Sequence, residues 1–464
     1  MNLQETPAID QRSDQLFAKV RELVVAVLNG DDSRNRARRA VISVFCIRVA
    51  SAALVYLSQI AMARWMGSFD YGIYVFVWAW VLILGGLAPG GLALSVIRLF
   101  PQHLEHGETN MVRGILLYGR LFVLGLSTSL AIIAVGTLYL LSDFIPEHYL
   151  LPLVLSLACV PLLALSDMHD GIGRARSWIW ESLLPSYVLR PITLLAVLAG
   201  TVWLGLPVSA TTAVVATIVA LGLSLLIQFS LIEWRIRGLV PAGPTQANVG
   251  LWTRTSLPLF MISGCDLLMQ YADVLVISAY LQPNEVGVYF AAAKTMALIL
   301  FVHYAVGSAT ANQFATLSAR GDNIGLERAA RDAVALMFWP SLLFAVLLLL
   351  LGQPLLRLFG PSFTDGYPIM LILVFGYLFR AATGPADFLL NMAGEQLRSA
   401  YVFGSAALLN VGLNILLVPH FGTIGAATGM ALSLVFVAIL QVWLVYRRLG
   451  IRMWIGASPT LVQS

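Results

Sequence analysis

The sequence predicts an all-α polytopic membrane protein of about twelve transmembrane helices, arranged as two six-helix lobes. Three observations support this fold class: an apolar composition, a series of apolar runs that could each cross a bilayer, and one motif that recurs half a chain later. Of the 464 residues, 59% are hydrophobic and 11% are charged, whereas soluble domains carry about 25% charged residues. A soluble protein of this length would lack the charge to cover its surface, so lipid is the expected solvent.

Apolar runs of about 20 residues, the length that crosses about 30 Å of hydrocarbon as a helix, recur throughout the chain. We expect spans at residues 41–63, 72–97, 115–141, 149–166, 183–204, 209–232, 255–280, 287–316, 333–352, 368–390, 397–418 and 421–446. The edges of the fourth and fifth spans are obscured by polar residues and a proline. Among these, Asp167, His169 and Asp170 resemble a metal triad only superficially, and we interpret them as a solvated cytoplasmic turn.

Arginines in the short loops are distributed unequally between the two sides of the membrane. Only Arg64 and Arg357 fall in the loops of one side. The opposite side contains Arg34, Arg36, Arg38, Arg39, Arg113, Arg174, Arg176, Arg235, Arg237, Arg254, Arg320, Arg328, Arg331, Arg398, Arg447, Arg448 and Arg452. Because cytoplasmic loops retain Lys and Arg, both termini are predicted to be cytoplasmic, which requires an even number of spans.

The spans and loops together predict five segments. Residues 1–39 form a cytoplasmic N-terminal segment, in which 14–28 have the pattern of an amphipathic helix on the membrane surface; a frayed tail is the alternative. The other segments are an N-lobe of six helices (40–233), a cytoplasmic linker (234–253), a C-lobe of six helices (254–449) and a cytoplasmic tail (450–464).

One motif occurs in the first hairpin of each predicted lobe. Residues 63–74 align with 278–289 at a constant offset of about 215 residues, which pairs Asp70 with Glu285, Gly72 with Gly287 and Tyr74 with Tyr289. Duplication of a six-span unit preserves its orientation, so the lobes should be related by a pseudo-twofold axis along the membrane normal. Substrate would then bind between them, and alternating access is the expected mechanism.

Several functional classes are excluded by the sequence. No Walker A motif is present, the Lys and Arg residues form no basic stripe with stacking aromatics that would bind nucleic acid, and we find no catalytic constellation or metal site. We therefore expect a protein that is not an enzyme, and that carries no cofactor or metal.

Charged residues within the predicted spans are the candidate site residues, because an ionised side chain at the centre of a span costs at least about 2.5 kcal/mol and normally faces a cavity or a partner. The cations are Arg48, Arg120, Arg190, Lys294 and Arg380, and the anions are Asp266, Asp273 and Asp387, with Glu181 at a span edge. The excess of cations indicates an anionic ligand.

The five cations are not equivalent. Arg48 and Lys294 are the strongest candidates, because each lies beside a repeat hairpin. Arg190 and Arg380 could bind ligand or pair within the fold, and Arg120, near a span end, is expected to extend to the membrane surface. Asp266 and Asp273 share one face of the seventh span, where they would be either partners of the cations or a site for a proton or Na⁺.

Three segments resemble the polysaccharide flippases (Wzx-type, polysaccharide transporter family) of the multidrug, oligosaccharidyl-lipid and polysaccharide exporter (MOP) superfamily. They are LSQIAMARWMGSFDYGIYVF, ADVLVISAYLQPNEVGVYFAAAK and LNMAGEQLRSAYVFGSAALLNVGLNILLVPHFGTIGAATGMALS. The similarity covers residues 38–450. It implies two lobes around a cavity in the bacterial inner membrane, which move an undecaprenyl-diphosphate-linked oligosaccharide outward for exopolysaccharide, capsule or O-antigen synthesis.

The resemblance also implies roles for the buried cations and a set of partners. Arg48 and Lys294, with Arg380 and Arg190, would hold the substrate diphosphate, and coupling would be to H⁺, Na⁺ or the membrane potential. A polysaccharide polymerase and chain-length proteins would be partners, besides membrane lipid. Two alternatives remain: a cation-coupled multidrug antiporter of the same superfamily, which the surplus of cations disfavours, and a non-transporting scaffold for polysaccharide enzymes.

Overall fold

The computed structural model describes the backbone of residues 33–456 and the side chains of residues 50–456. Internal contacts divide the chain into two units, residues 1–55 and 56–464. In the first unit, the described residues 33–55 are helical, and the amphipathic helix predicted at 14–28 lies outside the described residues. All contacts reported below are within the second unit.

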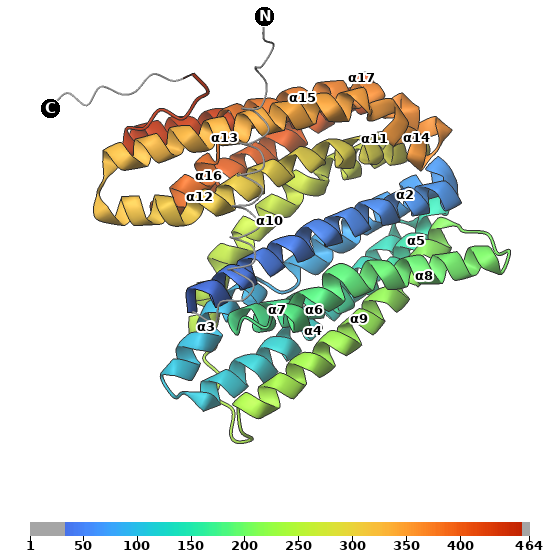
Figure 1. The fold of residues 1–464 in the computed structure, drawn as a ribbon. Coiled ribbons are helices and arrows are strands. Elements are labelled where there is room, and N and C mark those ends of the chain that lie inside the picture. The colour runs from blue at the N-terminus through green and yellow to red at the C-terminus, as the bar shows by residue number, and fades with distance from the viewer. Residues whose placement is uncertain (1–32, 457–464) are drawn as a thin grey trace, which may run out of the picture. The chain divides into compact units, whose positions relative to one another are not determined.

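The described chain contains helices and no strands, as the apolar composition predicts (Figure 1). The first block of helices consists of α2 (Ser33–Leu87), α3 (Leu92–Glu105), α4 (Thr109–Leu140), α5 (Glu147–Ser156), α6 (Cys159–Ala175), α7 (Ile179–Leu184), α8 (Arg190–Trp203) and α9 (Ala210–Leu239). The second block consists of α10 (Val249–Tyr280), α11 (Pro283–Met296), α12 (Leu300–Arg320), α13 (Asn323–Leu350), α14 (Gly352–Phe359), α15 (Tyr367–Ala382), α16 (Ala386–Met392) and α17 (Gln396–Leu449). Short 3₁₀ or π turns η1 (Ser142–Phe144), η2 (Pro185–Leu189), η3 (Ala297–Ile299) and η4 (Pro361–Gly366) interrupt them.

Within the described residues, ten segments are long and apolar enough to cross a membrane. Two of them contain a glycine with positive φ, Gly67 in α2 and Gly422 in α17, and glycine adopts this conformation without steric cost. The chain folds back at Gly67. This turn brings the Tyr71 hydroxyl close enough to Gln59 to donate to its Oε1 at 2.9 Å. The chain also folds back at Gly422, and the backbones on either side of this turn approach closely. A methyl group on Gly425 would lie 2.5 Å from the Leu417 carbonyl oxygen. Counting each of these segments as a hairpin yields the twelve predicted spans.

The polar cluster that follows the fourth predicted span is not a solvated turn, which corrects the sequence-based interpretation. Asp167, His169 and Asp170 lie inside α6, and His169 and Asp170 are buried. Asp170 pairs with Arg174 at 3.1 Å and also accepts a hydrogen bond from the Ser182 hydroxyl. Arg174 lies four residues along the same helix, and Ser182 lies on α7. Because both satisfy the Asp170 carboxylate, α6 can continue through a polar stretch.

The predicted linker at 234–253 is shorter in the structure, where α9 continues to Leu239 and α10 begins at Val249. The connection between them is fastened to α4. Arg113 donates to the carbonyl oxygens of Pro241 at 2.6 Å and Pro244 at 2.9 Å. The Gln246 amide donates to the Asn110 carbonyl oxygen at 3.0 Å. Six-helix lobes are thus joined by a connection whose backbone polar groups are tied to the first lobe.

Candidate functional site

A cavity of about 310 Å³ in the second block contains four of the charged residues proposed from the sequence, namely Asp266, Asp273, Lys294 and Arg380. Its walls come from α10, α11, α12, α15 and α17. The remaining polar and aromatic lining includes Gln270, Tyr289, Phe290, Tyr304, Tyr377 and Phe403. The structure therefore brings together residues that are more than a hundred positions apart in the sequence.

Lys294 reaches this cavity from α11 and is half-buried. Its ammonium nitrogen lies 5.1 Å from the ring centroid of Phe290 and 5.3 Å from that of Tyr271. Aromatic faces stabilise a desolvated cation but do not neutralise it. Asp273 acts on Lys294 electrostatically, yet none of the described ion pairs includes this lysine. Lys294 is therefore a cation in an apolar setting whose charge is available to a ligand.

Asp273 lines the same cavity, is buried, and is held by two hydrogen bonds. The Tyr289 hydroxyl donates to Oδ2 at 2.6 Å, and Asn410 Nδ2 donates to Oδ1 at 3.1 Å. Asn414 Nδ2 in turn donates to Asn410 Oδ1 at 3.0 Å, and the side-chain oxygen Oδ1 of Asn414 is buried with no partner in the described structure. Charge-assisted hydrogen bonds of this kind fix a carboxylate in one position.

Asp266 stands seven residues earlier on α10 in a different environment. Its side chain is exposed, and Oδ2 accepts a hydrogen bond from Gln270 Nε2 at 2.8 Å. The sequence placed both aspartates on one face, and both line the cavity. Only Asp273 is buried, so the two carboxylates differ in their access to solvent.

Arg380 lines the cavity from α15 and shares its charge with a buried cluster behind the wall. Its Nη2 lies 3.6 Å from Asp387 Oδ2, which also lies 3.1 Å from His303 Nε2. The Arg380 guanidinium carbon lies 5.6 Å from the Phe403 ring centroid, and Nε has no partner in the described structure. Arg380 is therefore partly neutralised, and it retains a donor for a ligand. His303 was missed from the sequence because a single histidine in an apolar helix carries no pattern.

The remaining predicted cations lie elsewhere. Arg190, on α8, does not line the cavity; it acts electrostatically on Asp167 and on Tyr271, whose ring also faces Lys294. The side chain of Arg48 lies outside the described residues. Arg120 is partly buried, and Glu233 on α9 supplies a counter-charge 3.0 Å from its Nη1.

The groups around this cavity are suited to binding a ligand. Within the part of the chain that the structure describes, no group of three His, Cys, Asp or Glu residues could hold a metal ion. Two cations, two carboxylates and several aromatic rings around one cavity can bind a polar anionic group by charge and stacking. Two lobes of membrane helices, the second of which holds a cavity lined by ionisable residues, define the class of secondary membrane transporters.

Residues 37–311 match the family of polysaccharide biosynthesis proteins, and residues 258–416 match the MatE family. The first match covers more than half of the chain, so the chain belongs to the polysaccharide biosynthesis protein family. The resemblance to polysaccharide flippases of the MOP superfamily, inferred from three sequence segments, is confirmed.

Two archaeal proteins are similar in sequence. An uncharacterized membrane protein of Methanocaldococcus jannaschii is 21% identical over 418 residues, which cover 85% of this chain and 80% of that protein. The probable low-salt glycan biosynthesis flippase Agl15 of Haloferax volcanii is 25% identical over 179 residues, 37% of this chain and 36% of the flippase. The first likeness extends over nearly the whole chain, whereas the second is confined to about a third of each protein.

Two solved structures share the fold at low sequence identity. A multidrug resistance MATE family transporter in its inward-facing conformation superposes with a TM-score of 0.72 at 15% identity, over 88% of this chain and 98% of that chain. The lipid II flippase MurJ in an inward closed conformation superposes with a TM-score of 0.67 at 15% identity, over 87% of both chains. The predicted arrangement of twelve helices in two lobes is thereby confirmed.

Proposed function

We propose that this protein is a flippase that carries an undecaprenyl-diphosphate-linked oligosaccharide from the cytoplasmic to the outer leaflet by alternating access. The observation that carries the proposal is the position of Lys294. It lies in a cavity between membrane helices, with aromatic rings around it and no carboxylate of the described residues in an ion pair with it. A cation held in this way favours an anionic ligand, and the family to which the chain belongs favours a polysaccharide precursor.

The cavity contains groups suited to each part of such a substrate. Lys294 and the free Nε of Arg380 would bind diphosphate oxygens through charge-assisted hydrogen bonds. Gln270 and the aromatic side chains of Tyr304 and Tyr377 would contact the first sugar by hydrogen bonding and stacking. Arg190 of the first lobe, which acts on Tyr271 beside Lys294, would approach the same ligand when the lobes move.

Both termini are proposed to be cytoplasmic, in a bacterial inner membrane. This orientation places the turn at Gly67 and the connection between α10 and α11 on the outer side. On that side the two lobes are in contact at Gly72 and Pro283. Their backbones are so close that a methyl group on Gly72 would overlap the Pro283 carbonyl oxygen. Closure at the outer end is the state in which a substrate made in the cytoplasm would be loaded, and a polymerase with chain-length proteins would take the product on the outer side.

The decisive experiment is replacement of Lys294 in a host whose own copy of the gene is deleted. Lys294→Gln should abolish surface polysaccharide and cause lipid-linked units to accumulate on the inner leaflet, while Lys294→Arg should retain part of the activity because it keeps the charge. Arg331→Gln is the matched control, since Arg331 pairs with Glu327 four residues away and does not line the cavity.

Each alternative predicts another outcome of this experiment. A scaffold would leave polysaccharide intact in Lys294→Gln at normal expression. A multidrug antiporter would show changed resistance to cationic dyes with polysaccharide unaffected. Mass analysis of the lipid-linked molecule that accumulates in the deletion strain would identify the sugar.

A second proposal concerns the driving force and rests on Asp273. Its buried carboxylate is linked through Asn410 to Asn414, whose side-chain Oδ1 has no partner among the described residues, and oxygen ligands of this kind bind a proton or a hard cation such as Na⁺. Transport into vesicles should then depend on an imposed Na⁺ or proton gradient in the wild type and lose this dependence in Asp273→Asn. If the transport rate of both the wild type and Asp273→Asn follows only the membrane potential, the potential acting on the charged substrate is the driving force.

A further inference from the structure

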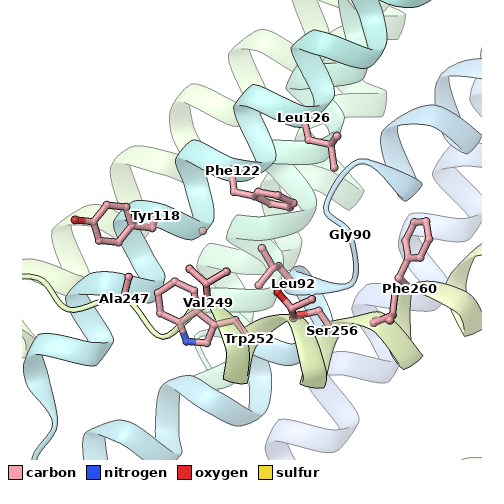
Figure 2. A pocket seen from close by; sticks show the side chains of 13 residues that line it. Gly90, Leu92, Tyr118, Phe122, Leu126, Ala247, Val249, Trp252, Ser256 and Phe260 are labelled. Carbon is pink, nitrogen blue, oxygen red and sulfur yellow. The ribbon is translucent and has the colours of Figure 1, made fainter.

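A second and larger cavity, of about 720 Å³, lies at the junction of the two lobes (Figure 2). It forms a groove between α4, the end of the connection that follows α9, and the first turns of α10. The lining residues are Gly90, Leu92, Tyr118, Gly119, Phe122, Leu126, Ala247, Val249, Trp252, Thr253, Ser256, Leu257 and Phe260. Figure 2 shows Phe122 and Leu126 of α4 on one side of the groove and Phe260 and Ser256 of α10 on the other.

The groove offers little to a polar ligand. The Ser256 hydroxyl is paired with the Ser95 hydroxyl at 2.7 Å, and the Tyr118 hydroxyl lies 3.4 Å from the Thr245 hydroxyl. Trp252 is buried, and its indole nitrogen, which has no partner in the described structure, lies on the edge of the ring farther from Phe122 and Leu126 (Figure 2). Most of the remaining wall is hydrocarbon, so the occupant that fits it is an apolar chain.

The groove is open to its surroundings rather than enclosed. Phe122 is 51% exposed, and Leu257 and Val249 are also exposed. A concave apolar surface of this kind in a soluble protein would bind a partner or aggregate. In a protein whose solvent is lipid, a hydrocarbon chain enters it without leaving an apolar environment.

The groove and the charged cavity are both lined by α10, which distinguishes this groove from the general lipid-facing surface. Phe260 lines the groove and Asp266 lines the cavity. Six residues separate them, about 9 Å along a helix that rises 1.5 Å per residue. At 3.6 residues per turn they also lie about 120° apart around the helix axis, so one molecule with a charged head and a long apolar tail would occupy both sites by passing around α10.

We propose that the groove binds the isoprenoid chain of the lipid-linked substrate while the diphosphate occupies the cavity beside Lys294. This inference rests on the proposed flippase function and adds a site for the tail, which the charged cavity cannot accommodate. The chain enters from the bilayer between α4 and α10, so it never crosses the polar cavity. Recognition of the lipid then depends on two sites with opposite chemistry.

The test is photo-crosslinking on the full-length protein in vesicles of phosphatidylcholine and phosphatidylglycerol. The probe is undecaprenyl diphosphate with a diazirine in its hydrocarbon chain, and the labelled peptides are mapped by mass spectrometry. Labelling should fall on residues 118–126 and 247–260, and unlabelled undecaprenyl diphosphate should compete for it. Labelling elsewhere, or equal competition by additional phosphatidylglycerol, would overturn the assignment, because the groove would then be unused or would bind any membrane lipid.

A matched pair of variants on α10 tests whether the shape of the groove is responsible. Leu257→Trp fills the groove, whereas Met261→Trp adds the same bulk to a side chain of equal exposure that does not line it. We expect Leu257→Trp to lower crosslinking about tenfold, since it displaces several buried methylene groups of the chain, and Met261→Trp to leave it unchanged. Equal labelling of the two variants would contradict the proposal, and normal purification of both proteins checks their folding.

Failure of this inference differs from failure of the proposed function. If Lys294→Gln transports normally while the groove is still labelled, the diphosphate assignment fails and the tail site stands. If Lys294→Gln abolishes transport but the chain labels other surfaces, the tail site fails and the flippase function stands.

Discussion

Gly72 and Gly287, which occupy equivalent positions in the two copies of the repeated motif, pack directly against each other's chain segments. A methyl group on Gly287 would lie 2.8 Å from the Ser68 carbonyl oxygen and 3.2 Å from the Gly72 amide nitrogen, and one on Gly72 would overlap the Pro283 carbonyl oxygen. Neither glycine has a positive φ. Both are required for close approach of two backbones, which relates the sequence repeat to the contact between the lobes.

Gly72→Ala is expected to disrupt this contact, because its neighbour is backbone and cannot move aside as a side chain would. Overpacking of this kind costs about 1–3 kcal/mol, and it would act on the closed outer end alone. We expect increased modification of a cysteine introduced at Asn284, which is exposed near the contact, by a membrane-impermeant reagent. Gly136→Ala, which meets open space, is the control, and unchanged modification in Gly72→Ala would show that the contact does not close the protein.

Tyr289→Phe is expected to destabilise the second lobe by removing the hydroxyl that donates to Asp273. A hydrogen bond to a charged group contributes about 1.5–3 kcal/mol, measurable as a lower thermal unfolding midpoint in detergent. Tyr377→Phe removes a hydroxyl from the same cavity that has no described bond to Asp273. The two variants should therefore differ, and equal destabilisation would indicate that the hydroxyls act only through packing.

Arg380, Asp387 and His303 are expected to behave as one unit. Arg380→Gln and Asp387→Asn should each lower transport, and the double variant should be less impaired than the sum of the two effects, because each single change leaves the other group without its partner. Coupling free energies between contacting residues are about 0.5–3 kcal/mol. Strict additivity in a double-mutant cycle of transport rates would show that Arg380 acts on the substrate without help from Asp387.

Arg113→Ala is expected to release the connection between the lobes from α4. The variant loses the hydrogen bonds to the Pro241 and Pro244 carbonyl oxygens, so proteolytic cleavage within residues 240–248 should become faster while the membrane helices remain protected. Arg237→Ala is the control, since that side chain is exposed and its ion pair with Glu233 is 3.7 Å long. Cleavage at the wild-type rate in Arg113→Ala would mean that the bulk of the neighbouring helices is what restrains the connection.

The membrane class, the twelve spans and the individual charged residues could be predicted from the sequence, because each depends on local composition. Periodicity and charge cannot indicate a partner on another helix. For this reason Asp170 was assigned to a turn, although Arg174 at helical spacing was a readable sign of the pair that keeps it in α6. The aligned acidic residues of the repeat show the same limit. Asp70 accepts a hydrogen bond from the Ala210 amide at the start of α9, whereas Glu285 accepts one from the Gln282 amide at the start of its own helix.

Apolarity along the chain by itself determined where this protein resides, and the rare charges within it indicated an anionic ligand. Only the tertiary structure decided which of those charges act together. Lys294, Asp273 and Arg380 meet in one cavity, Arg120 is neutralised by Glu233, and Arg190 lies outside the cavity wall. The physical reason is that a charge inside a membrane protein is stabilised or left available by its neighbours in space, and helix packing brings those neighbours from distant parts of the chain.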